Sequence, residues 1–164
     1  INRFIDFSNL DSILEIGAGS GKQAFNIIKS FPNIKYVIVD IPPTLYIAQR
    51  YLSECFPEKK VAKFKVYEDQ EDFRHSFLEN DLMFIFPEQL IFLDKSSITM
   101  VLAIDCLHEM KKDTIDYYFN IADKVSTFFY FEAWKKTRIP FDGLELNENS
   151  YPISKKWINQ SQKF

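Results

Sequence analysis

Three glycines alternate with small residues in the stretch ILEIGAGSGKQAF, which runs from Ile13 to Phe25. An apolar run precedes Gly17, and apolar residues with helical spacing follow Gly21. Glycines at a turn from a strand into a helix let a ligand approach the main chain closely, because they carry no side chain. This stretch is therefore the first candidate for a ligand-binding loop.

The spacing of the loop excludes a phosphate loop of the nucleoside-triphosphatase type. Such a loop needs a glycine five positions before its Gly-Lys pair and a serine or threonine after the lysine, but Ile16 and Gln23 stand there. A dinucleotide loop has the spacing G-x-G-x-x-G, whereas the spacing here is G-x-G-x-G. In addition, Glu15 lies two residues before Gly17, where a carboxylate suits a ligand with an ammonium group better than a pyrophosphate.

Two further polar residues stand close to the ends of predicted strands. Asp40 ends the run KYVIVD, nineteen residues after Gly21, and a carboxylate at that place can accept hydrogen bonds from both hydroxyls of a ribose. His108 comes soon after the run ITMVLAI, residues 98–104. A neutral imidazole can remove the proton of a hydroxyl group while that hydroxyl attacks.

The pattern E-x-G-x-G-x-G, from Glu15 to Gly21, resembles motif I of the class I S-adenosylmethionine-dependent methyltransferases. In that family the loop holds the methionine part of the cofactor, and the acid at the end of the next strand binds the ribose. The resemblance implies S-adenosyl-L-methionine as the cofactor. The cofactor-binding residues that we expect are Glu15, Gly17, Ala18, Gly19, Gly21, Asp40, Ile41 and Asp105.

The segment DCLHEM, residues 105–110, resembles the segment of small-molecule O-methyltransferases that carries their general base. The resemblance makes His108 the expected catalytic base, with Glu109 as the acid that follows it, although Met110 replaces a tryptophan of that pattern. Together with VDIPP and FIFPEQL, the segment looks most like a family of bacterial sugar O-methyltransferases. The implied reaction is methyl transfer to a hydroxyl of a sugar, a sugar nucleotide or another small molecule.

For several residues near the expected site, the sequence allows either a binding role or a purely structural one. Phe86 could stack on adenine and Glu88 or Gln89 could bind it, or Pro87 simply ends the strand. Trp134 lines a substrate pocket or belongs to the core. Because some sugar methyltransferases use Mg²⁺ in place of a histidine base, the candidate metal ligands are Asp105, Glu109 and Glu132.

The apolar patterns along the chain predict an α/β fold, a Rossmann-like open and mostly parallel sheet with helices on both faces. Helices are expected from Lys22 to about Phe31, from about Thr44 to Phe56, and after a cap at Asp113. The acidic segment 67–81 is interpreted as a solvated connection that could be helical. The tail from residue 137 mixes turn residues with a segment that could form a short hairpin. The predicted strands are residues 12–16, 35–40, 82–86, 97–105 and 127–134, with a possible short strand at 61–66.

The composition fits one globular domain over residues 1–164, with a net charge of −3 and a pI of about 5.5. This acidic balance does not support a nucleic-acid or membrane surface, and no apolar run approaches the roughly 20 residues of a transmembrane helix. Cys55 and Cys106 read as buried free thiols in a reducing compartment, the cytoplasm. The chain begins at Ile1, which indicates a piece of a longer protein, and a homodimer is compatible with these features.

Two other classes of function remain open from the sequence. One is an oxidoreductase or epimerase that binds a nicotinamide dinucleotide through the glycine loop. The other is a domain that keeps the methyltransferase fold but has no catalytic activity. Binding of S-adenosylhomocysteine in preference to NAD would favour the methyltransferase over the oxidoreductase or epimerase. A non-catalytic domain is expected to fold but to bind no cofactor.

Overall fold

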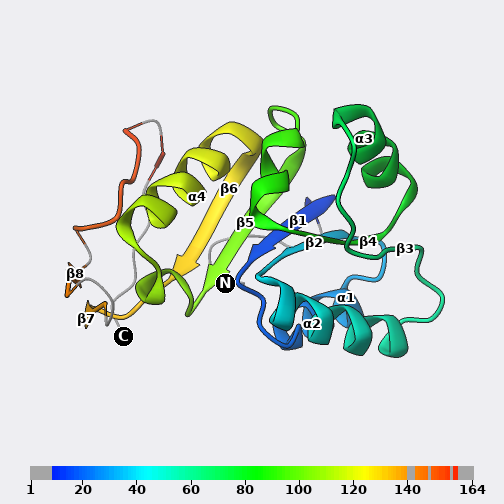
Figure 1. Cartoon of the computed structure of the whole chain (residues 1–164), viewed down its shortest axis with the longest axis horizontal. Helices are drawn as coiled ribbons and strands as arrows, with labels where there is room; N and C mark the ends of the chain where they lie inside the picture. The colour runs from blue at the N-terminus through cyan, green and yellow to red at the C-terminus, as the bar shows by residue number, and fades with distance from the viewer. Residues whose placement is uncertain (1–8, 140–142, 148, 156, 159–164) are drawn as a thin grey trace.

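The computed structural model describes residues 9–139, 143–147, 149–155 and 157–158. The apolar runs of the sequence form a six-stranded sheet in the order β3-β4-β2-β1-β5-β6, in which every pair of neighbours is parallel (Figure 1). Near-continuous apolar sequence is typical of strands covered on both faces. The strands are β1 Ser12–Ile16, β2 Lys35–Val39, β3 Val61–Ala62, β4 Leu82–Ile85, β5 Ile98–Ile104 and β6 Ser126–Glu132.

Helices cover both faces of this sheet, as the α/β prediction requires (Figure 1). α1 (Lys22–Ser30) and α2 (Pro42–Cys55) pack on the face to which Ile13 points, whereas α3 (Gln70–Glu79) and α4 (Lys112–Val125) pack on the face of Leu14. The alternation of side chains along β1 thus divides the core into two hydrophobic clusters. Two short 3-10 helices, η2 (Pro87–Phe92) and η3 (Leu107–Glu109), follow β4 and β5.

The structure corrects four details of the sequence interpretation. α2 begins at Pro42 rather than Thr44, because prolines fit the first turn of a helix, where no N–H partner is needed. α4 has Lys111 at its N-cap, so Asp113 lies in the first turn and the predicted cap is wrong. The strand expected at 61–66 is only β3, two residues long. Cys55 is exposed, contrary to the prediction, whereas Cys106 is buried as predicted.

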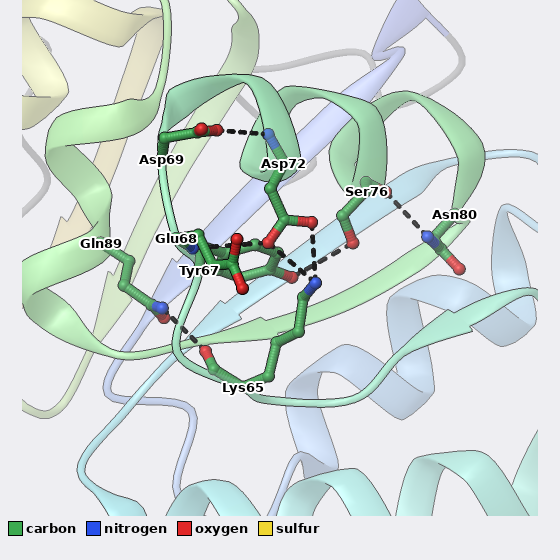
Figure 2. Close-up of polar contacts among 8 residues, drawn as sticks. All are labelled: Lys65, Tyr67, Glu68, Asp69, Asp72, Ser76, Asn80 and Gln89. Atoms are coloured by element: carbon green, nitrogen blue, oxygen red, sulfur yellow. Dashed lines mark hydrogen bonds and ion pairs between the residues drawn. The ribbon is translucent and has the colours of Figure 1, made fainter.

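The acidic connection contains α3, and its polar side chains explain how it folds (Figure 2). Asp69 caps the helix by accepting a hydrogen bond of 2.9 Å from the amide N–H of Asp72. The Asp72 carboxylate in turn binds the ammonium group of Lys65 at 2.8 Å. Phe73 is buried and Phe77 packs against the same core cluster, so these apolar side chains fix an otherwise solvated helix to the sheet.

After β6, β7 (Lys136–Arg138) and β8 (Glu145–Asn147) form an antiparallel pair, as the predicted hairpin required. Figure 1 shows this pair beyond the β6 edge of the sheet. Within the described ranges, no helix has the length and apolar character needed to cross a lipid bilayer.

Candidate active site

The topology places the candidate site where the strand order changes direction. From β1 the chain proceeds to β2 and β4 on one side, and then to β5 and β6 on the other side of β1. Ligands of open parallel sheets bind beyond the carboxyl ends of the strands at such a point. Gly17 follows β1 and Cys106 lies two residues after β5, so the glycine loop and the segment 105–110 lie side by side at this edge of the sheet, which we call the crevice.

Gly17 makes the closest approach between the two sides of this crevice. A Cβ atom placed on Gly17 would lie 2.7 Å from Cβ of Cys106, and the φ of Gly17 is +67°. The thiol of Cys106 also donates a hydrogen bond of 3.3 Å to the carbonyl oxygen of Ile16. Only glycine fits between β1 and the end of β5 at this position, for steric and conformational reasons together.

The middle of the loop is open to a ligand. Gly19 has a φ of +56°, and a Cβ atom built on it would meet nothing within 4 Å. The amide N–H of Gly21 donates to the carbonyl of Ala18 at 3.0 Å, which tightens the turn into α1. The result is a main-chain cradle at Gly19 that a ligand could contact, of the kind that the sequence predicted.

Asp40 is joined directly to this cradle. Its Oδ2 accepts a hydrogen bond of 2.8 Å from the amide N–H of Gly19, and its Oδ1 accepts from the amide of Ile41 at 2.7 Å and from the hydroxyl of Thr44 at 2.6 Å. Thr44 was not identified from the sequence. An ionised carboxylate has about four acceptor positions, so Asp40 retains capacity for a ligand hydroxyl. Ile41 beside it is 59% exposed.

Glu15 lies beneath the loop and not on its surface. It is 3% exposed, and its carboxylate accepts a hydrogen bond of 2.9 Å from the hydroxyl of Tyr36. Burial raises the pKa of Glu15 to about 7, an effect that the Tyr36 hydrogen bond opposes and the nearby Asp40 charge reinforces. Glu15 can therefore act on a ligand in the crevice through its electric field, not through an exposed carboxylate.

Several carboxylates lie near the thiol of Cys106. Its pKa is raised to about 12, first by burial and then by the carboxylates of Asp40, Glu15, Glu109 and Asp105. These residues belong to three different strand ends, and their charges act on one atom at the centre of the crevice. A cationic ligand is favoured there and a pyrophosphate is repelled.

His108 lies on η3 and is 5% exposed. The indole of Trp134 stacks on its imidazole, with ring centroids 5.0 Å apart and an angle of 25° between the planes. Trp134 itself is 60% exposed, so it is not part of the core. Asp105 contacts both rings: its Oδ1 accepts a hydrogen bond of 2.9 Å from Nε1 of Trp134 and lies 3.7 Å from Nε2 of His108.

At the end of β4, the residues expected near adenine have different roles in the structure. Gln89 is buried and both ends of its amide bind the main chain. Its Oε1 accepts from Phe86 N at 2.8 Å, and its Nε2 donates to the Lys65 carbonyl at 2.8 Å (Figure 2). This arrangement makes Gln89 a structural residue. Phe86 packs edge to face on Phe64 with ring centroids 5.6 Å apart, and Glu88 remains beside it as the polar candidate.

Tyr118 is buried, as its predicted place on the apolar side of a helix requires. It lies on α4, and burial raises the pKa of its hydroxyl, with further contributions from Tyr117, Cys106, Asp40 and Glu88. The hydroxyl therefore lies within electrostatic reach of the ends of β2, β4 and β5.

The three acids considered for a metal do not form a centre. Among the described residues no group of three or more His, Cys, Asp or Glu side chains is arranged to hold a metal ion. Asp105 instead accepts the indole N–H of Trp134. Asp105 and Glu109 contribute negative charge near Cys106, and the described residues provide no preformed ligand set.

Comparisons with known proteins agree with this geometry. The chain aligns with the pyocyanin biosynthetic protein PhzM (TM-score 0.53, 14% identity, 87% of this chain and 37% of that one). It aligns likewise with the mitomycin 7-O-methyltransferase MmcR (TM-score 0.53, 15% identity, 83% of this chain and 35% of that one). These likenesses show the fold, and the chain spans little more than a third of either protein. No curated protein matches the sequence.

A family model gives the more specific result. The model of an O-methyltransferase domain matches residues 1–97, which is more than half of the 164 residues. The matched part includes the glycine loop, Asp40 and the end of β4. This match does not favour the alternative of a nicotinamide-dependent oxidoreductase. The chain belongs to the family of O-methyltransferase domains.

Proposed function

We propose that this chain is the cofactor-binding domain of an S-adenosylmethionine-dependent O-methyltransferase that acts on a hydroxyl of a small molecule. The observation that carries the proposal is the hydrogen bond between Gly19 N and Asp40 Oδ2. It joins the open main-chain cradle after β1 to the acid after β2, the two features that must contact the amino-acid and ribose parts of one nucleoside.

The residues of the crevice fit such a cofactor in both shape and charge. The cradle at Gly19 has room for a ligand, and Asp40 has remaining acceptor capacity for one ribose hydroxyl. Ile41 offers an exposed apolar surface next to Asp40, with Phe86 and Glu88 on the adenine side. The negative field at Cys106 suits a sulfonium and an ammonium group. Bound there, S-adenosylmethionine would supply an activated methyl group.

His108 is the residue that we assign to proton removal. A hydroxyl is a weak nucleophile until its proton leaves, and a neutral imidazole accepts that proton near neutral pH. With S-adenosylmethionine bound, the hydroxyl oxygen would take the methyl group from the sulfonium while the hydroxyl proton passes to His108. The products are a methyl ether, neutral S-adenosylhomocysteine and an imidazolium that later releases its proton to water.

The acceptor class rests on the sequence resemblance alone. DCLHEM and FIFPEQL favour a sugar or a sugar nucleotide. The negative crevice favours an acceptor whose phosphate groups, if it has any, lie away from the reacting hydroxyl. A panel of neutral sugars, sugar nucleotides and phenols, with radiolabelled methyl transfer as the readout, tests this. The same assay is run with added Mg²⁺ and with EDTA, which removes the metal. Methyl transfer that is unchanged by EDTA supports His108 as the base.

The cofactor is tested first by calorimetric titration with S-adenosylhomocysteine. A parallel titration with NAD tests the alternative oxidoreductase function. We expect binding of S-adenosylhomocysteine and none of NAD. Tighter binding of NAD would replace the proposal by the oxidoreductase alternative. Failure of a folded chain to bind either ligand would leave the non-catalytic domain as the better interpretation.

A further inference from the structure

The indole of Trp134 covers the imidazole of His108, the residue assigned to proton removal. His108 is only 5% exposed, and the indole stacks on its ring with centroids 5.0 Å apart and an angle of 25° between the planes. Trp134 itself is 60% exposed, so the indole forms the solvent side of this pair. With so little exposed surface, the imidazole cannot meet an acceptor from solvent while the indole stays in place.

The two nitrogens of His108 differ in their distance from solvent. Nδ1 is buried and, in the part of the chain that the structure describes, has no hydrogen-bond partner. Nε2 lies 3.7 Å from Oδ1 of Asp105, too far for a hydrogen bond, and the Asp105 side chain is 66% exposed. The edge of the imidazole that carries Nε2 is therefore the one that an acceptor can reach once the indole moves.

Two contacts hold the indole over His108, and neither is strong. One is the stack itself. The other is the hydrogen bond of 2.9 Å from Nε1 of Trp134 to Oδ1 of Asp105, which is exposed to solvent. Contacts of these two kinds each favour the covered arrangement by about 3- to 10-fold. Together they predict that the indole leaves the imidazole in roughly one molecule in 10 to one in 100.

Trp134 stands in a connection where its side chain can move without disturbing the sheet. β6 ends at Glu132 and β7 begins at Lys136, and residues 133–135 belong to neither a helix nor a strand. The carbonyl of Glu132 accepts a hydrogen bond of 3.0 Å from the amide N–H of Asp105, which keeps the ends of β5 and β6 together. Rotation of the Trp134 side chain breaks none of these main-chain contacts.

We propose that Trp134 is a gate that controls access of the acceptor to His108, closed when its indole stacks on the imidazole and opened when the acceptor displaces it. This inference rests on the proposed function and adds a regulated step to it. Only the open fraction of molecules can bind the acceptor productively, so the closed arrangement weakens the apparent affinity by the same factor. The gate also shields the imidazole from solvent when no acceptor is present.

The first test measures how fast His108 reacts with diethyl pyrocarbonate at a pH of about 7, where an ordinary imidazole is mostly neutral. The chain has two histidines, and the exposed His75 is the internal reference. Mass spectrometry of the peptides gives a rate for each. We expect Trp134→Ala to raise the His108 rate by about 10- to 100-fold and to leave the His75 rate unchanged. An unchanged His108 rate would overturn the proposal.

Two further variants keep this result specific to the gate. Trp134→Phe retains a ring for the stack but has no N–H for Asp105, so its His108 rate should lie between those of the parent and Trp134→Ala. Tyr46→Ala removes an aromatic side chain of α2 that is 51% exposed, and it should leave the His108 rate at the parent value. An equal rise in Tyr46→Ala would show general loosening of the fold and would contradict the gate.

The second test uses methyl transfer to the first acceptor identified in the panel. Because the acceptor no longer has to displace an indole, Trp134→Ala should lower KM by about 10- to 100-fold and change kcat little. A raised KM would mean that the indole binds the acceptor directly, and it would overturn the gate.

Titration with S-adenosylhomocysteine separates this inference from the proposed function. The affinity of Trp134→Ala should stay within about twofold of the parent, since the gate faces the acceptor and not the cofactor. A parent that binds S-adenosylhomocysteine, with a His108 rate equal to that of Trp134→Ala, refutes only the gate. A parent whose His108 is uncovered by Trp134→Ala, but which binds no S-adenosylhomocysteine, refutes only the proposed function.

Discussion

The amide N–H of Gly19 lies 2.8 Å from Oδ2 of Asp40, and this contact links the turn after β1 to the end of β2. Asp40 also accepts hydrogen bonds from Ile41 and Thr44. The carboxylate is therefore both the anchor of the glycine loop and the predicted ribose ligand. These two roles respond differently to substitution.

Asp40→Ala is expected to weaken S-adenosylhomocysteine binding by about 10- to 100-fold, since hydrogen bonds to a charged group contribute about 1.5–3 kcal/mol. Asp40→Asn should lose less, because its amide oxygen can still accept the Gly19 N–H. Calorimetric titration gives both values. Glu54→Ala removes an equally charged but exposed side chain of α2 and should leave the affinity unchanged. Equal affinity of Asp40→Ala and the parent would remove Asp40 from the cofactor site.

Gly17→Ala and Gly19→Ala form a matched pair. Both glycines have positive φ, but only at Gly17 would the new Cβ collide with Cys106. We expect Gly17→Ala to lower the free energy of unfolding by about 2–4 kcal/mol, from the left-handed backbone and overpacking together. Gly19→Ala should cost only about 1–2 kcal/mol and should instead reduce cofactor affinity. Urea denaturation and titration with S-adenosylhomocysteine measure the two effects, and the reverse order would contradict this description of the loop.

The stability of the protein should depend on pH through Glu15. Its folded-state pKa of about 7 lies above the ordinary value of 4.5, so between these values the folded state binds more protons than the unfolded state. The contribution is therefore present below pH 4.5 and is lost as the pH rises through 7. The loss is on the order of 3 kcal/mol at about 1.4 kcal/mol per pKa unit.

Glu15→Gln isolates the pH-dependent contribution of Glu15 to stability. Glutamine can still accept a hydrogen bond from the Tyr36 hydroxyl, but it does not ionise. The difference in unfolding free energy between variant and parent, measured by denaturation from pH 5 to 8, should increase in favour of the variant as the pH rises. A difference that stays constant over this range would show that Glu15 titrates normally.

His108→Ala is expected to slow methyl transfer by about 10²- to 10⁴-fold, the range typical of a lost general base. The affinity for S-adenosylhomocysteine should remain close to that of the parent. His75→Ala, at an exposed position, is the control for both measurements. The assay uses the first acceptor identified in the panel of sugars, sugar nucleotides and phenols. Turnover of His108→Ala equal to that of the parent would exclude His108 from the chemistry.

Much of the fold was predictable because it depends on local patterns. β1, β2, β4 and β5 are apolar runs of strand length, and the spacing of apolar residues from Lys22 gave α1. The observed strand order puts β1 between β2 and β5, and it places the glycine loop beside segment 105–110. The bounds that failed, at Thr44 and Asp113, lie at helix starts where several residues can serve as caps.

The candidate site was less predictable because its side-chain geometry depends on contacts distant in sequence. Asp40 was expected near the glycine loop, but the hydroxyl of Thr44 on the same carboxylate was not. The amide of Gln89 binds the carbonyl of Lys65, 24 residues away, which no short motif encodes. Likewise, Trp134 and Asp105 are 29 residues apart in the chain and meet only because β5 and β6 are neighbours.

The contrast between the two cysteines has a practical consequence. Cys55 is exposed on α2, whereas Cys106 is buried with a pKa of about 12 and so forms little thiolate at neutral pH. A maleimide dye should react at Cys55 alone and leave the centre of the crevice unmodified. The natural sequence thus allows attachment of a fluorophore at one position without engineering, for following ligand binding by optical methods.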